Sequence, residues 1–272
     1  MTSNTAFDLR SGTASAILGG SAGIVKTTTG VVTLAGVNTY TGTTTITQGI
    51  LQVDGSINGP VVVASPGTLA GSGSIFGAVS GTGTARPGPL GAGILTIQGN
   101  LTSIGSLAFE IRPQGLEPTA TRLVVNGTAN LAGTSTQITS TPGGIPAGAN
   151  LVLLQNDLAD ALTINGATSP TPGSTVTLGA TPFVVGYSGG TGNDLVITAN
   201  PTPAATLTIV SGNAQSTVIG SPFAAPLVVQ ARDALGSHVV DADVIFVAPA
   251  AGASRTVTGG TTTRPRRVSP RT

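Results

Sequence analysis

The chain has 272 residues and a net charge of +1; 40 residues are glycine, 8% are charged, 3% are aromatic and none is cysteine. The lack of cysteine excludes disulfide bridges and thiolate chemistry, and the low charge argues against a disordered chain. Val, Ile and Thr, which favour strands, are abundant, whereas the helix formers Lys, Glu and Met are scarce. The composition predicts an all-β protein of short strands and glycine turns.

The first twenty residues, MTSNTAFDLRSGTASAILGG, lack the basic start and the continuous apolar core of a signal peptide. No apolar run in the sequence approaches the roughly 18 residues that a membrane-spanning helix requires. We therefore expect neither a signal peptide nor a transmembrane helix in this chain.

Apolar residues recur at a nearly constant spacing over residues 44–97, and they form two series. The first series consists of Ile46, Val63, Val79 and Ile97, and the second of Leu51, Leu69 and Ala85. Glycines punctuate the gaps between successive members. This pattern predicts a solenoid in which the apolar residues of each series stack on one another and close a continuous core.

Residues 23–53, GIVKTTTGVVTLAGVNTYTGTTTITQGILQV, resemble the autotransporter-associated β-strand repeat. That repeat reads approximately G-L-x-K-x-G-x-G-x-L-x-L-x-G-x-N-x-Y-x-G-x-T-x-I-x-x-G-x-L. The matching residues are Gly23, Lys26, Gly30, Leu34, Gly36, Asn38, Tyr40, Gly42, Thr44, Ile46, Gly49 and Leu51.

Residues 54–79, 93–101 and 122–198 also resemble passenger segments of this family. The resemblance implies that residues 1–199 form a right-handed parallel β-helix on a bacterial surface. Residues 84–88, TARPG, depart from the family, because Arg86 stands at a position that is often apolar. We expect the charge of Arg86 to loosen that coil.

Parallel β-helices also include polysaccharide lyases and glycosidases, which need a pair of carboxylates. The acids of this chain are scattered, and Glu110 and Glu117, on either side of a Pro/Gly loop, are the nearest to such a pair. The sequence favours a role in loop solubility for both, and we expect no catalytic residue and no cofactor.

Residues 189–197, GGTGNDLVI, match the nonapeptide G-G-x-G-x-D-x-U-x that binds calcium in repeated β-helices. Calcium takes about six to eight oxygen ligands, and a single copy of the nonapeptide supplies too few. The flanking segments alternate like strands. We therefore interpret GGTGN as a turn that Asn193 or Asp194 caps, and we expect no metal site.

A Pro/Ala linker, residues 200–206, follows the predicted solenoid. Residues 207–263 resemble bacterial Ig-like adhesin repeats, but they are too few for the seven strands of a complete sandwich. We expect an incomplete Ig-like β-sandwich. Residues 264–272 form an irregular basic tail, and the abrupt change of composition near residue 263 suggests a frameshift.

Two features of this C-terminal part could carry function. His238, Asp241 and Asp243 could hold a metal, but strand alternation separates the histidine from the two acids, which favours a solvated turn and strand face. The basic residues Arg255, Arg264, Arg266, Arg267 and Arg271 could contact nucleic acid. No basic patch elsewhere supports that contact, and we expect no nucleic-acid partner.

The sequence as a whole favours a non-catalytic stalk or passenger segment of a bacterial autotransporter-like surface protein. The resemblance implies a secreted or outer-membrane-associated location, with an outer-membrane β-barrel anchoring the full-length protein. Host or neighbouring-cell surface ligands are the expected partners. Two alternatives stay open, which are an adhesin module that binds cells directly and an enzyme that acts on polysaccharides.

Overall fold

A computed structural model describes most of the chain. The described residues are 1–88, 93–114, 118–143, 145–146, 148–157, 160–164, 169–178, 181–199, 204–218, 221, 223–232, 242–244 and 260–262. Within these residues all regular elements are β-strands, which confirms the predicted all-β class. The same residues contain no helix with the length and hydropathy of a membrane span.

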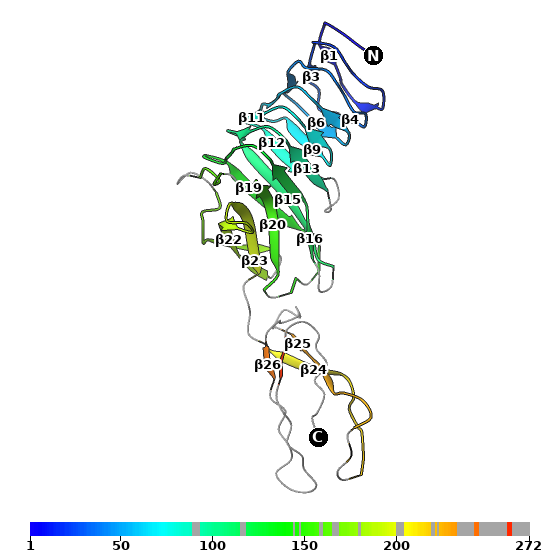
Figure 1. The fold of residues 1–272 in the computed structure, drawn as a ribbon, viewed down its shortest axis with the longest axis vertical. Coiled ribbons are helices and arrows are strands. Elements are labelled where there is room, and N and C mark those ends of the chain that lie inside the picture. Colours follow the sequence, from blue (N-terminus) through cyan, green and yellow to red (C-terminus); the bar gives the residue numbers. More distant parts are fainter. Residues whose placement is uncertain are drawn as a thin grey trace.

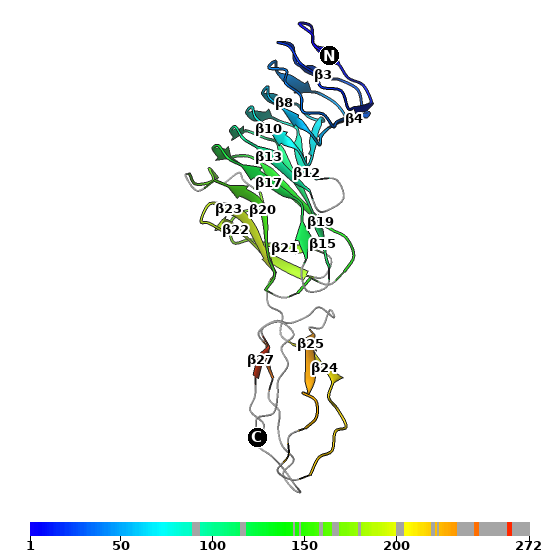
Figure 2. The ribbon, with the colours of Figure 1, turned by 45° about the vertical axis from the view of Figure 1, so that its right-hand side comes forward.

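Successive strands of residues 44–156 enter three sheets in rotation, whereas the strands before residue 44 alternate between the first two of these sheets (Figures 1 and 2). The first sheet contains β1 (Phe7–Asp8), β3 (Ile24–Lys26), β5 (Thr44–Ile46), β8 (Val61–Val63), β11 (Val79–Gly81), β14 (Leu101–Thr102) and β18 (Ala129–Asn130). The second contains β2 (Gly12–Ala14), β4 (Val31–Leu34), β6 (Ile50–Val53), β9 (Thr68–Gly71), β12 (Thr84–Pro87) and β15 (Ser106–Arg112), with β16 (Thr119–Ala120) and β19 (Ser135–Ser140) beside β15. The third contains β7 (Ser56–Ile57), β10 (Ser74–Ile75), β13 (Ile94–Ile97), β17 (Arg122–Val125) and β20 (Asn150–Asn156).

We call one passage through the three sheets a coil. Each coil lies on the previous one through parallel pairing, and the coils differ in length. In the first sheet Thr44 pairs with Val61, Val61 with Val79, Val79 with Leu101 and Leu101 with Ala129. The separation in sequence between partners grows at every step of this series. Measured in this sheet, the coils therefore lengthen from β5 onward while the parallel pairing continues.

The second apolar series of the sequence stacks as predicted. Leu51 pairs with Leu69, and Leu69 pairs with Ala85. All three side chains are fully buried. Apolar side chains are removed from water here because each coil covers the inward row of its neighbour.

The first apolar series is predicted correctly only in part. Ile46 pairs with Val63, but Val79 pairs with Val61 rather than with Val63. Ile97 lies in the third sheet, where it pairs with Val125. The spacing misleads because all three sheets contribute apolar triplets. The coil that starts at Val79 reaches the first sheet again at Leu101, and Ile97 comes before that point, in the third sheet.

The expectation that Arg86 loosens its coil is wrong for the described residues. β12 remains paired with β9 from Thr84 to Pro87. Arg86 lies on the outer face of the sheet and is exposed. Its charge stays in water, so it does not disturb the core.

Glycines stack on glycines at the corner that joins the third sheet to the first. A Cβ on Gly77 would lie 2.5 Å from the carbonyl oxygen of Gly59, and one on Gly99 would lie 2.7 Å from that of Gly77. A Cβ on Gly59 would likewise collide with the carbonyl oxygen of Gly42. We call Gly42, Gly59, Gly77 and Gly99 the glycine column. Any larger residue would push two coils apart at this corner.

Antiparallel strands follow β20 in the third sheet. β23 (Asp194–Ala199) pairs with β20 in the antiparallel direction. β22 (Thr181–Gly189) and then β21 (Thr175–Leu178) continue the sheet outward, again antiparallel. Apolar residues of these strands, including Phe183, Leu195 and Ile197, join the same core cluster as the coils.

Two further antiparallel pairs lie in the segment expected to be an incomplete Ig-like unit. β24 (Thr206–Ser211) pairs with β25 (Val228–Arg232), and β26 (Ala242–Val244) pairs with β27 (Gly260–Thr262). Residues 200–203 of the predicted linker, residues 233–241 and 245–259, and the tail from residue 263 onward lie outside the described residues.

The glycine column gives a stability prediction. Gly77→Ala should lower the free energy of unfolding by about 3 kcal/mol, because the new methyl group overpacks against the backbone of Gly59. Gly133→Ala is the comparison, because Gly133 has a φ of 76° and no atom within 4 Å of its Cβ position. That change should cost about 1 kcal/mol of backbone strain. Urea unfolding followed by circular dichroism measures the loss of unfolding free energy in each variant. Equal losses would contradict the close packing that we assign to the glycine column.

Candidate functional site

The GGTGND segment forms the turn between β22 and β23. Gly189 pairs with Asp194 at the end of this hairpin. Gly190 has a φ of 57° and Gly192 a φ of 108°. These left-handed conformations favour glycine. The structure therefore confirms that the segment is a turn, as the sequence predicted.

Asp194 fastens this turn to the neighbouring strand. Its side chain is 3% exposed. Oδ1 accepts the backbone N–H of Asn156 at 2.9 Å, and Oδ2 accepts the backbone N–H of Thr191 at 3.2 Å. Asn193 donates its Nδ2 to the carbonyl oxygens of Asp160, at 2.8 Å, and of Asp157. Both carboxylate oxygens of Asp194 thus already have protein donors.

These contacts give the segment a structural role as a turn, because both carboxylate oxygens of Asp194 are engaged within the protein. A calcium ion requires several free oxygen ligands that converge on one point. Within the described residues there is no group of three or more His, Asp or Glu side chains that could hold a metal ion.

Glu110 lies on β15 beside Arg112. The Arg112 Nε lies 3.6 Å from Glu110 Oε1, and both side chains are about one-third exposed. The backbone N–H of Glu110 donates to Thr121 Oγ1 at 2.9 Å. Glu117, the second acid of the proposed pair, lies outside the described residues. Glu110 is therefore engaged in an ion pair at the surface.

The remaining candidates of the C-terminal part fall largely outside the described residues. His238 and Asp241 lie there, as do the basic residues Arg255, Arg264, Arg266, Arg267 and Arg271. Asp243 belongs to β26, where it pairs with Thr261 through the backbone.

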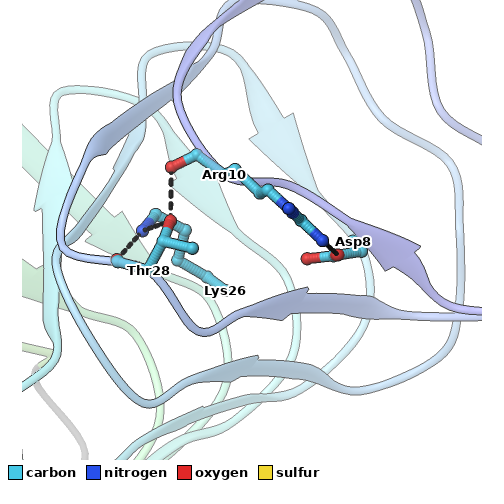
Figure 3. Close-up of polar contacts among 4 residues, drawn as sticks. All are labelled: Asp8, Arg10, Lys26 and Thr28. Atoms are coloured by element: carbon cyan, nitrogen blue, oxygen red, sulfur yellow. Dashed lines mark hydrogen bonds and ion pairs between the residues drawn. The ribbon is translucent and has the colours of Figure 1, made fainter.

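A network of hydrogen bonds around a buried lysine joins the second and third coils. Lys26 is fully buried. Its Nζ donates to the carbonyl oxygen of Thr28, to Thr28 Oγ1 at 3.1 Å and to the carbonyl oxygen of Gln48 at 3.3 Å. Thr28 Oγ1 in turn donates to the carbonyl oxygen of Arg10 at 2.7 Å (Figure 3). This chain of contacts connects three successive coils.

Lys26 has no acidic partner within ion-pair distance among the described residues. The neighbouring acid, Asp8, pairs instead with Arg10 at 3.1 Å on the surface (Figure 3). Removal from water disfavours the ammonium form and lowers the pKa of Lys26. Backbone carbonyl oxygens and one hydroxyl therefore solvate this cation in place of a carboxylate.

Asn38 is buried at the corner of the second coil. Its Oδ1 accepts the backbone N–H of Leu18 at 2.9 Å, and its Nδ2 donates to the carbonyl oxygens of Gly36, at 2.9 Å, and Ser56, at 3.1 Å. Leu18 and Ser56 belong to the preceding and following coils. The side-chain amide thus supplies the hydrogen bonds that the backbone lacks where the strands are interrupted.

Tyr40 and Thr44 form the third buried polar contact. The Tyr40 hydroxyl lies 2.6 Å from Thr44 Oγ1, and both side chains are fully buried. Burial raises the pKa of Tyr40 to about 12, although the hydrogen bond with Thr44 opposes part of this shift. The phenol therefore stays protonated throughout the neutral range.

The buried polar contacts fasten coils and offer no access to a substrate. Lys26 and Asn38 use their donors inside the protein, Tyr40 shares a hydrogen bond with Thr44, and all three residues are closed to solvent. The sequence identified these residues only as matches to a repeat. Alternation of inward and outward residues in β3 would have placed Lys26 on the inner face with Ile24.

The sequence matches no protein-family profile and no curated protein sequence.

The buried Tyr40 predicts a loss of stability in alkali. Its folded-state pKa of about 12 exceeds the ordinary value of 10.0. The stability that it contributes is therefore complete below pH 10 and decreases as the pH rises towards 12, by about 2 kcal/mol at pH 12. Tyr40→Phe should remove this part of the pH dependence, while costing about 1 kcal/mol at pH 8 for the lost hydrogen bond.

Urea unfolding at pH 8, 10 and 12 measures the difference between wild type and Tyr40→Phe. Tyr187, whose pKa burial also raises, is present in both proteins and cancels in the comparison. Identical alkaline losses in the two proteins would contradict the assignment.

A structural role for Asp194 predicts that its removal destabilises the protein without any effect of calcium. Asp194→Ala should lower the free energy of unfolding by about 2 kcal/mol, because it leaves the N–H groups of Asn156 and Thr191 without an acceptor. Asp8→Ala, at an exposed acid whose surface ion pair with Arg10 contributes little, should change it by less than about 1 kcal/mol. Thermal unfolding with millimolar calcium or a chelator provides the check, and a calcium-dependent Tm in wild type that Asp194→Ala abolishes would overturn it.

Proposed function

We propose that residues 1–199 are a non-catalytic, rod-forming segment of a bacterial surface protein, built as a right-handed parallel β-helix of the autotransporter-passenger type. The observation that carries this proposal is the rotation of successive strands through three parallel sheets around one buried core. Such an arrangement gains length with each coil while each coil contacts only its neighbours. The resemblance to the autotransporter-associated repeat supplies the handedness and the family.

The positions of the repeat motif have physical roles in the described structure, which supports the resemblance. Leu34, Ile46 and Leu51 are fully buried apolar side chains. Lys26 and Asn38 bridge coils through hydrogen bonds. The motif glycines that include Gly23, Gly42 and Gly49 lie where a Cβ would collide with a neighbouring backbone. The motif therefore corresponds to the residues that a stacked coil needs.

The surface of the coils between residues 11 and 85 also fits a passive rod. Between residues 11 and 85 the sequence has two charged residues, Lys26 and Asp54. Lys26 is buried, which leaves Asp54 as the charge on this surface. A surface with so little charge exerts little electrostatic attraction on ions or charged substrates.

Location and partners follow from the resemblance and belong to the same proposal. The full-length protein would be secreted or associated with the outer membrane. The rod would hold other parts of that protein away from the cell, where they meet host or neighbouring-cell surfaces. Catalysis on polysaccharides requires a pair of working carboxylates, and the described acid of the candidate pair, Glu110, is engaged by Arg112.

A second candidate function is direct adhesion through the C-terminal unit. Leu207 and Ile209 of β24 lie on one face of the β24–β25 hairpin and are 57% and 58% exposed. Exposed apolar side chains that cluster on one face are typical of a surface that meets a partner.

A change in coil number tests the rod. Three additional copies of residues 61–78, inserted after Ala78, extend the first-sheet interval from Val61 to Val79 by three coils. The protein should stay folded and lengthen by about 14 Å, because neighbouring strands lie about 4.8 Å apart. Small-angle X-ray scattering measures the maximum dimension, and copies with shuffled sequence are the control.

Three outcomes would contradict the proposal. A folded protein of unchanged length would show that the coils do not add along one axis. Saturable binding of the purified wild-type chain to intact cells would favour the adhesin, and turnover of a polysaccharide that Glu110→Gln abolishes would favour the enzyme.

A further inference from the structure

We propose that the buried Lys26 is a register lock, which selects one alignment of the first three coils without adding to their stability. The inference concerns how this sequence specifies one structure, and it holds whether or not the chain serves as a rod.

The apolar pattern alone leaves the alignment of β3 and β5 open. In the structure Val25 pairs with Thr45, and Lys26 with Ile46. A shift of two residues keeps every side chain on its own face of the sheet, because side chains alternate with a period of two. Val25 would then face Thr47 or Thr43, which are chemically identical to Thr45.

The inner face tolerates one of these shifts almost as well. The shift that places Val25 opposite Thr43 places Lys26 opposite Thr44. The shift in the other direction, which places Val25 opposite Thr47, places Ile24 opposite Ile46. A contact of Ile24 with Ile46 would again be apolar. Hydrophobic burial is not directional, so it discriminates poorly between the two alignments.

Hydrogen bonds that cross between the second and third coils do discriminate. Lys26 Nζ donates to the carbonyl oxygen of Gln48 at 3.3 Å, and Thr47 Oγ1 donates to the carbonyl oxygen of Lys26 at 3.2 Å. A two-residue shift displaces these partners by about 6.6 Å along the strand. The ammonium group would lose a partner in a site closed to water, where an unsatisfied charge is strongly disfavoured.

The first coil is aligned by the same group of residues. Thr28, whose carbonyl and hydroxyl oxygens both accept from Lys26, donates its Oγ1 to the carbonyl oxygen of Arg10 at 2.7 Å (Figure 3). A misplaced Lys26 therefore disturbs the contact between the first and second coils as well.

The lock differs from an ordinary stabilising contact. An apolar side chain of similar size in place of a buried charge often leaves stability unchanged or raised. Lys26→Met should therefore keep or raise the Tm and, at the same time, allow shifted alignments. A merely stabilising lysine would behave in the opposite way.

The absence of cysteine from the chain provides a direct reading of alignment. Three double variants introduce one thiol in β3 and one in the β5 region: Val25→Cys with Thr45→Cys for the native alignment, and Val25→Cys with Thr43→Cys or Thr47→Cys for the two shifts. Each is made with Lys26 intact and with Lys26→Met. Dibromobimane, a short reagent that fluoresces when it bridges two thiols, reports which pair lies side by side.

With Lys26 intact, the native pair should be bridged at least about tenfold faster than either shifted pair. Lys26→Met should weaken this preference severalfold while the Tm stays equal or rises, and the contact of Asn38 with Ser56 keeps part of the preference. Ile46→Val is the matched control, because it changes the same contact between coils without touching the hydrogen bonds, and it should keep the native preference.

Either of two results overturns the proposal. One is that Lys26→Met keeps the tenfold preference for the native pair. The other is that Lys26→Met fails to fold or shows a much lower Tm while Lys26→Gln, which retains a donor, folds normally. The lysine would then be a stabilising contact rather than a selector of alignment.

Discussion

Successive coils are held at the separation of hydrogen-bonded strands, about 4.8 Å, and this distance governs the corners as much as the sheets. A corner must turn the chain through a space that the next coil's backbone already occupies on the other side. Glycines stack there because a Cβ on Gly77 or Gly99 would touch the carbonyl group of the previous coil. Glycine at these corners is therefore a requirement of close stacking.

Several polar side chains of the core supply hydrogen bonds where the backbone ladder is incomplete. Asn38 supplies hydrogen bonds to three backbone groups at a corner that no long strand covers. Lys26 and Thr28 do the same at the corner after β3. Each of these side chains joins consecutive coils, so the interior combines a non-directional apolar row with a few directional contacts. The apolar row gives cohesion, and the directional contacts distinguish one alignment from its neighbours.

The sequence predicted the strand class, the stacking of Leu51, Leu69 and Ala85, and the turn at GGTGND. Its error at Val79 and Ile97 has a physical cause, because side chains from all three sheets supply inward apolar residues and the coils differ in length. Contacts between distant residues were not predictable either. The partner of Asp194 is the backbone of Asn156, far away in the sequence, and nothing in a local pattern of turn residues identifies it.

The reversal of strand direction after β20 has a consequence for assembly. A stack of parallel strands is an open template, to which any similar coil could add in the same sense and so extend a fibre. β23 runs antiparallel to β20, and β22 and β21 continue that alternation outward. The outermost strand of this sheet, β21, therefore runs opposite to the stacked strands of the coils, so a coil added in the same sense could not pair with it in the parallel direction. The hairpin that covers the core thus also opposes head-to-tail polymerisation.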